Sequence, residues 1–286
     1  MKKYLLSMLV MLLLSPVFGQ GWRPEEMEIK VNIQNDEEAR ILHELNLQGD
    51  IYVNQARLFV IPQELELIKK SGLSWEVLIE NLNEYYQNFW ETKEAYHTYA
   101  EIIELSDSLV THFPDICTKI IYGTSLGGRQ LAALKISNNA TVNEIEPQLI
   151  FDGGIHGDEI GCSENVIRFA RDLCLNYNVD PYITELINTR EIWLYLMVNP
   201  DGRVNMTRYN NNGVDLNRDW GYMWDGEGSS PGAFSQVESK ALRTCVLENH
   251  FTIHTSYHSG TEFISCPWSY RSSTPPDMSH ILQLAG

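Results

Sequence analysis

The 286-residue chain is 43% hydrophobic and 21% charged, so it can bury a full-sized core, which excludes a wholly disordered protein. Its 21 Lys and Arg residues against 38 Asp and Glu residues give a formal net charge of -17, and so acidic a surface repels phosphate backbones and anionic lipids. We therefore expect no nucleic-acid partner, and the length predicts one large domain or a large domain with a small one.

The first residues are typical of an export signal. A basic pair precedes an apolar run from Tyr4 to Leu14, and the segment 17–19 is suited to cleavage. The run is too short to cross a bilayer of about 30 Å as a helix, so residues 1–19 are predicted to be a signal peptide; an uncleaved anchor is the alternative. The mature protein is then expected to begin at Gln20, to be secreted or periplasmic, and to lack a membrane anchor.

Five cysteines are scattered along the chain without a CxxC pair, which argues against a zinc site made of thiolates. Export would permit disulfides, but the spacing does not choose between partners, and an odd count leaves one thiol unpaired within the chain. These residues are Cys117, Cys162, Cys174, Cys245 and Cys266.

Residues 20–85 are predicted to form a small α/β domain with the order of an open sandwich. A strand-like alternation begins at Met27, and a helix is expected from Asp36. Gly49-Asp50 is interpreted as a turn, and residues 86–95 as a connector. The remaining elements are expected to be strands at 57–61 and 75–79, with a helix at 62–70 between them.

From residue 96 to residue 286 the pattern indicates a larger α/β domain. Near-continuous apolar strands separated by helices predict a mixed, mainly parallel sheet with helices on both faces. The expected helices lie at 98–112 and 159–177, and the expected strands lie near 120 and at 131–136, 148–151, 192–198 and 251–257.

The first cluster with chemical potential is His156-Gly157-Asp158-Glu159, where a predicted strand runs into a helix. A histidine and a carboxylate three residues apart at a helix start can turn toward one point, which suits a zinc ion with nitrogen and oxygen ligands at about 2.0 to 2.2 Å. The alternative is structural: Glu159 would occupy a favourable first helical turn and His156 would be a loop residue.

A second cluster follows the apolar strand at 192–198. Asn199-Pro200-Asp201-Gly202 contains turn signals, so the chain enters a loop at the carboxyl end of a buried strand, where α/β sheets place their sites. Arg208, Asn217 and Arg218 lie in this loop. One guanidinium with the Asn amide can bind a carboxylate and the other can stabilise an oxyanion; solvated surface charge is the alternative.

A third cluster, His258-Ser259-Gly260, ends the predicted strand 251–257. A catalytic zinc typically keeps three protein ligands and an open position for water, so a distant histidine would complete a two-His, one-Glu set. His254 competes with His258 because it lies four residues earlier on the same side of a strand. The residues alone indicate that one of the two is a ligand.

The combination of HxxE, NPDG, an arginine before DLNR and a histidine at a strand end resembles the zinc carboxypeptidase family, which includes pancreatic and regulatory carboxypeptidases. The resemblance begins near Tyr96 and reaches the last residues. It implies one zinc ion held by His156, Glu159 and His258, the last because the family places this histidine nine residues before a proline, here Pro267.

The resemblance also implies roles for the second cluster: Arg208 polarises the scissile carbonyl, and Asn217 with Arg218 binds the terminal carboxylate. Asp158 replaces an arginine of some digestive members, which favours the regulatory type. The implied protein is a monomeric zinc-dependent metallocarboxypeptidase that hydrolyses C-terminal peptide bonds, with peptide or protein C-termini as partners.

Residues 20–85 resemble the activation domain that covers the active-site cleft of many such enzymes, which implies a zymogen. The alternative is an unrelated small exported domain.

In the family, the glutamate that activates water and a tyrosine that closes over the substrate lie far beyond the third ligand. Only residues 259–286 follow His258 here; their one glutamate, Glu262, is not assigned as the base. We therefore expect residues 96–286 to be an incomplete catalytic domain and the chain to be an inactive fragment. The alternatives are a zinc amidohydrolase that deacylates acylated amino acids, and a non-catalytic pseudoenzyme that binds carboxylates.

Overall fold

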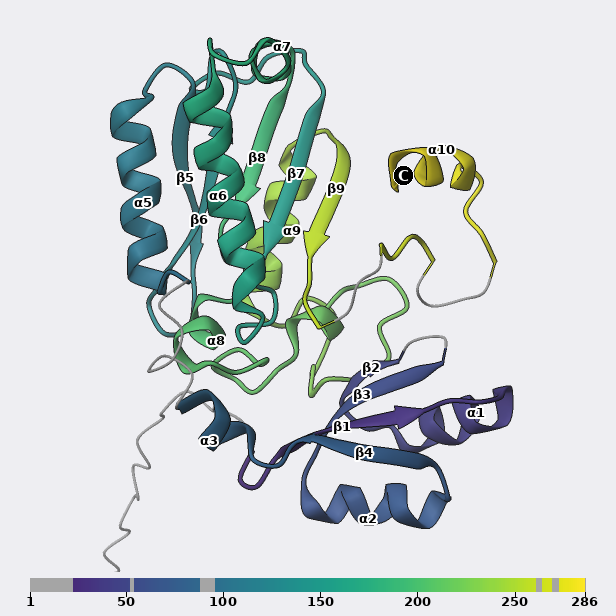
Figure 1. Ribbon diagram of the computed structural model, residues 1–286. Coiled ribbons are helices and arrows are strands. Elements are labelled where there is room, and N and C mark those ends of the chain that lie inside the picture. Colours follow the sequence, from purple (N-terminus) through teal and green to yellow (C-terminus); the bar gives the residue numbers. More distant parts are fainter. Residues whose placement is uncertain (1–22, 52–53, 88–95, 261–263, 269–272, 286) are drawn as a thin grey trace, which may run out of the picture.

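The structure is a computed structural model that describes residues 23–51, 54–87, 96–260, 264–268 and 273–285 (Figure 1). The predicted signal peptide, most of the predicted connector and Glu262 lie outside these residues. Among the described helices, none combines the length and the apolar character that a membrane crossing requires.

The N-terminal unit is an antiparallel sheet of order β2-β3-β1-β4 with two helices packed against it. The predicted turn at Gly49-Asp50 is wrong, because Gly49 begins a short strand that pairs with β3; a three-residue strand is too short to show an alternation of its own. The elements are β1 (Met27–Asn32), α1 (Asp36–Leu45), β2 (Gly49–Ile51), β3 (Gln55–Val60), α2 (Pro62–Ser71), β4 (Ser74–Ile79) and α3 (Leu82–Gln87).

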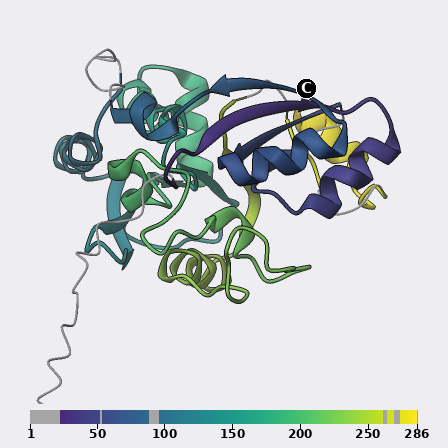
Figure 2. The ribbon, with the colours of Figure 1, turned by 90° about the horizontal axis from the view of Figure 1, so that it is seen from below.

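The two faces of β3 have different partners. Ala56, Leu58 and Val60 are buried in a core shared with α1 and α2. Because side chains alternate along a strand, Arg57 and Phe59 point to the opposite face, which lies against the larger unit (Figure 2). The small sheet is thus an open sandwich: its two helices cover one face, and its other face contacts the larger unit.

The larger unit has a sheet of order β5-β6-β8-β7-β9 in the described residues. The β5–β6 and β6–β8 pairs are antiparallel, and β8–β7 and β7–β9 are parallel. Its elements are α5 (Tyr99–His112), β5 (Cys117–Thr124), β6 (Gln130–Ile136), β7 (Gln148–Gly153), α6 (Ile160–Asn176), α7 (Pro181–Thr189), β8 (Glu191–Tyr195), α8 (Pro200–Asn205), the 3-10 helix η1 (Leu216–Arg218), α9 (Val237–Glu248), β9 (Phe251–Tyr257) and α10 (Met278–Ala285).

Helices cover both faces of this sheet, as predicted for a mixed α/β fold. Leu134 and Leu194 pack on one face into a core with α5 and α6, whereas Ala133 and Trp193 pack on the other face with Leu242 of α9. In Figure 1, α5 and α6 accordingly lie on one side of the strands and α9 on the other. The carboxyl ends of β7 and β9 point toward the N-terminal unit, so this edge of the sheet faces the small sheet.

A buried ion pair joins two neighbouring strands of this sheet. Lys135 of β6 and Glu191 of β8 have side chains 2% and 0% exposed, and the Lys135 Nζ lies 2.9 Å from the Glu191 Oε1. Gln148 and the backbone N–H of Glu144 also donate to Glu191, at 2.8 and 2.7 Å. Burial opposes ionisation of Glu191, but these donors together keep its pKa below the ordinary value.

Replacing Lys135 by methionine should therefore destabilise the protein strongly, because it leaves a buried carboxylate without its cation. We expect a loss of about 3–5 kcal/mol in the free energy of unfolding, measured by urea denaturation. The matched control is Lys119→Met on the neighbouring strand, whose partner Asp107 is 60% exposed. The control should cost under about 1 kcal/mol, and equal losses in both variants would contradict the prediction.

Candidate metal centre

The site begins where β7 ends and the chain turns into α6. His156 lies in this turn, and Glu159 is the N-cap residue of α6. Gly157 allows the turn to pack directly on α8, since a Cβ at this position would lie 1.9 Å from the backbone carbon of Gly202. The HxxE turn and the NPDG segment therefore touch backbone to backbone, which no residue with a side chain would permit.

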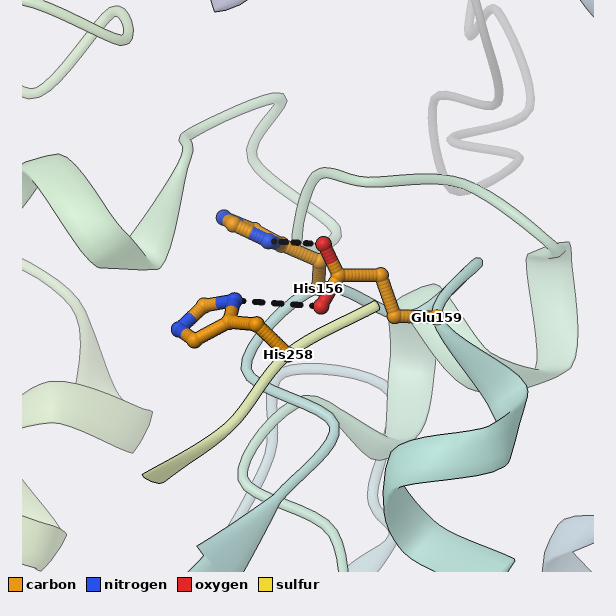
Figure 3. A group of neighbouring side chains, drawn as sticks. All are labelled: His156, Glu159 and His258. Atoms are coloured by element: carbon orange, nitrogen blue, oxygen red, sulfur yellow. Dashed lines mark hydrogen bonds and ion pairs between the residues drawn. The ribbon is translucent and has the colours of Figure 1, made fainter. Parts of the chain in front are cut away.

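Three side chains converge on one point at this edge of the sheet (Figure 3). The Glu159 carboxylate lies between two imidazoles: its Oε1 is 2.9 Å from the His156 Nδ1, and its Oε2 is 3.1 Å from the His258 Nδ1. One ligand atom of each residue lies within 4.8 Å of the others. The three side chains are 1%, 11% and 37% exposed for His156, Glu159 and His258, so the cluster is open on the His258 side.

His254 and His258 have different surroundings. His258 lies just beyond β9 and faces Glu159, and the Ser259 N–H donates to the same carboxylate oxygen at 3.2 Å. His254 lies within β9 and bonds through its Nε2 to Asp152. Burial opposes protonation of His254, but the hydrogen bond and charge of Asp152 outweigh it and raise its pKa. Of the two histidines, the structure brings only His258 to His156 and Glu159.

A buried aspartate connects the candidate metal ligands to the arginine cluster. The Asp215 carboxylate lies 3.2 Å from the His156 Nε2 and accepts a hydrogen bond of 2.8 Å from the Arg208 Nε. All three side chains are at most 4% exposed. Because the Nε2 is held by Asp215, the Nδ1 of His156 is the nitrogen that faces Glu159.

The charges of these groups perturb one another. Burial and the nearby Arg208 oppose protonation of His156, but Glu159 and Asp215 outweigh them and raise its pKa to about 9. Burial opposes ionisation of Asp215, but Arg208 and His156 outweigh it and hold its pKa well below the usual range. Burial and the charge of Glu159 raise the pKa of Asp158 to about 7.

Asn217 and Arg218 lie on η1, directly after Asp215, whose carboxylate caps this turn by accepting the Asn217 N–H at 2.8 Å. The Arg218 guanidinium donates through Nη2 to the backbone carbonyl of Gly49 in the N-terminal unit, at 2.8 Å. Its Nε lies 3.3 Å from Glu227. The structure thus places Arg218 beside an acceptor supplied by the small sheet.

The NPDG segment was predicted to be a turn, but Pro200 begins the short helix α8, with Asn199 as its N-cap. Proline at the first helical position and an Asn cap explain why local turn signals start a helix here. Asp201 of this helix accepts hydrogen bonds from Ser125 at 2.8 Å and Arg129 at 2.7 Å. These bonds connect the loop between β5 and β6 to α8.

The donor set fits a zinc ion, since two imidazole nitrogens and one carboxylate are the ligands of many catalytic zinc sites that leave a position open. Asp215 begins the DLNR run, but its role was not predicted from the sequence. The sequence shows that Asp215 lies two residues before the predicted carboxylate-binding pair, Asn217 and Arg218. This spacing does not show that the Asp215 carboxylate reaches His156.

Sequence comparisons relate most of this chain to zinc carboxypeptidases. The family model described as zinc carboxypeptidase matches residues 102–286. Carboxypeptidase A2 of Rattus norvegicus is 29% identical over 218 residues, and carboxypeptidase A1 of Mus musculus is 31% identical over 216 residues; each alignment covers 67% of this chain. Both cover 51% of the relative, so the chain spans about half the length of these curated relatives.

Among solved structures, carboxypeptidase A from Helicoverpa armigera aligns with a TM-score of 0.69 at 20% identity. The alignment covers 83% of this chain and 70% of the insect protein, which shows a shared fold. Because the family model matches well over half of the residues, the chain belongs to the zinc carboxypeptidase family.

Proposed function

We propose that this protein is a zinc-dependent metallocarboxypeptidase that hydrolyses the C-terminal peptide bond of peptides or proteins. The observation that carries the proposal is the convergence of His156, Glu159 and His258, linked through Asp215 to Arg208. We further propose that the protein acts outside the cytoplasm, in keeping with its N-terminal sequence, and that it acts as a monomer.

His156, Glu159 and His258 would hold one zinc ion, with the two Nδ1 atoms and the carboxylate as ligand atoms. A bound zinc supplies a Lewis acid that polarises a carbonyl and lowers the pKa of a bound water to about 7. Asp215 would keep the His156 ring in position by accepting its Nε2 hydrogen.

Arg208 and Arg218 would interact with different groups of the substrate. Arg208 would stabilise the negative charge that develops on the scissile carbonyl oxygen, because its guanidinium is buried and aligned by Asp215. Arg218 and Asn217 would bind the free terminal carboxylate, for which a guanidinium fork is a suitable partner. A C-terminal residue held at Arg218 would place the preceding peptide bond toward the metal.

We propose that the N-terminal unit covers the site and keeps the protein a zymogen. Three contacts support this: Gly49 accepts from Arg218, the Phe59 ring lies 5.2 Å from the Arg208 guanidinium carbon, and Tyr209 bonds to Gln48. The Gly49 carbonyl occupies an Arg218 donor that a substrate carboxylate would need. Removal of the unit would break the contact of Gly49 with Arg218 and that of Phe59 with Arg208.

Zinc content separates the two candidate histidines. His258→Ala should lose bound zinc, because two protein ligands are too few for a stable site, whereas His254→Ala should retain it. The measurement is the metal content of purified variants by elemental analysis. Equal zinc in both variants, or loss only in His254→Ala, would overturn the ligand assignment.

Zinc uptake should release a proton from His156. Its pKa of about 9 leaves it mostly protonated at pH 7 without metal, and zinc requires the neutral ring. The pKa of His156 is higher in the folded protein than in the unfolded chain, where it is about 6.5. The pairing of His156 with Glu159 and Asp215 therefore stabilises the metal-free protein fully below about pH 6.5, and this stabilisation is lost as the pH rises through 9. We expect His156 to release about one proton at pH 7 and fewer at pH 9, measured calorimetrically in buffers of different ionisation enthalpy.

Asp215→Asn is the control for this titration, because it removes one of the two carboxylates that raise the His156 pKa. It should release fewer protons at pH 8 than the wild type. Zinc uptake without proton release at pH 7 would contradict the prediction.

Arg218→Met should weaken recognition of a free C-terminus. We expect KM for peptides to rise about 10²-fold, since a charge-assisted pair to the carboxylate is lost, and the preference for free over amidated C-termini to disappear. Arg171→Met is the control, because Arg171 pairs with Asp172 on the outside of α6. The assay is release of the terminal amino acid from matched peptide acids and amides.

The same assay tests the reaction itself. Release of acyl groups from acylated amino acids with no release of terminal residues from peptides would favour the amidohydrolase. Binding of peptide acids by the metal-loaded protein with hydrolysis of neither substrate would favour a pseudoenzyme.

A further inference from the structure

The N-terminal unit contacts the loop that follows the third candidate ligand, in addition to the two arginines. Arg57 on β3 donates through Nη1 to the backbone carbonyl of Gly260 at 2.9 Å. Gly260 lies two residues beyond His258, at the end of the short segment that carries this histidine out of β9. This contact therefore holds the segment that carries the third candidate ligand, and it is separate from the Arg218–Gly49 bond.

Arg57 is oriented within its own unit. Its Nη2 lies 2.5 Å from the Oε1 of Glu28 on the adjacent strand β1, and the Glu28 side chain is only 6% exposed. The ion pair leaves Nη1 directed at Gly260. Because a guanidinium is planar and presents its donors in a fixed fork, holding one nitrogen fixes the direction of the other.

The Gly260 backbone is adapted to this contact. Its φ of +103° is in the left-handed region, and a Cβ here would lie 2.5 Å from the Arg57 Nη1. A residue with a side chain would be strained and would displace the guanidinium.

The segment between β9 and Gly260 is anchored at two points. At one end, the His258 Nδ1 and the Ser259 N–H both bond to Glu159, at 3.1 and 3.2 Å. At the other end, Arg57 holds the Gly260 carbonyl. His258 is the most exposed of the three candidate ligands and lies past the last paired residue of β9, so its position depends on these few bonds more than that of His156.

We propose that Arg57 is a positioning residue for the metal centre: by holding the Gly260 carbonyl, two residues after His258, the N-terminal unit stabilises the proposed zinc site. The inference rests on the proposed zinc centre. The coupling is reciprocal, because a metal bound better by the docked form strengthens docking by the same factor. The covered protein retains zinc more tightly than one in which the small sheet has been released.

The test compares zinc loss from wild type, Arg57→Met and Arg40→Met, each as the full chain loaded with zinc. Methionine keeps an apolar stem but removes both donors, and Arg40 is an exposed residue of the same unit that pairs with Glu37 and Glu44. Zinc transfer to an excess of a chromogenic chelator is followed by absorbance. We expect about tenfold faster loss from Arg57→Met, the effect typical of removing a bond outside the ligand set, and an unchanged rate for Arg40→Met.

Thermal unfolding of the three metal-free proteins separates metal positioning from general stability. Positioning predicts faster zinc loss from Arg57→Met with similar metal-free melting temperatures. If Arg57→Met does not fold, Arg57→Lys carries the same comparison, because it keeps the charge next to Glu28 but cannot serve both acceptors with a fork.

The outcomes distinguish this inference from the function on which it rests. A wild-type protein that binds no zinc overturns the proposed centre and this inference with it. A wild-type protein that holds zinc and loses it at the same rate as Arg57→Met overturns only the role of Arg57. A lower metal-free melting temperature with an unchanged rate of zinc loss also overturns it, since Arg57 is then merely structural.

Discussion

The site depends above all on one buried carboxylate. Asp215 bonds to the His156 Nε2 and to the Arg208 Nε, with all three side chains nearly inaccessible to solvent. A charge buried this deeply is costly unless its partners satisfy it, and both partners are cationic in the metal-free state. The same bonds hold the His156 ring, whose Nδ1 faces Glu159, and the Arg208 guanidinium, so the proposed metal ligand and the proposed oxyanion-stabilising group share one partner.

The fold supplies the loops that carry these groups. The turn after β7 and the helix α8 after β8 pack backbone to backbone at Gly157 and Gly202, because neighbouring parallel strands bring their carboxyl ends to one edge of the sheet. Asp201 then binds the loop between β5 and β6 through Arg129. The turn after β7, the helix α8 and the β5–β6 loop are thereby held together at one edge of the sheet.

The small N-terminal sheet meets this site through its uncovered face. Gly49, Arg57 and Phe59 each contact a different functional element, namely Arg218, the loop after His258 and Arg208. For Arg57 and Phe59 this follows from alternation along β3, since one set of side chains fills the domain core while the other set projects outward. Gly49 lies on β2 and makes its contact through its backbone carbonyl. The unit therefore contacts both arginines of the proposed substrate site and the segment that follows the proposed ligand His258.

The sequence by itself determined the α/β class, the long helices and apolar strands, and the order of the HxxE, NPDG and DLNR segments, because periodicity and motif spacing are local properties. The residues alone left His254 and His258 as alternatives, between which the family resemblance favoured His258, and the local pattern at Gly49-Asp50 was interpreted as a turn. Only the tertiary structure paired His254 with Asp152 and placed His258 beside Glu159. Strand pairing also made Gly49 part of β2. Such contacts join residues far apart in the chain, and their geometry is set by packing, which no local pattern encodes.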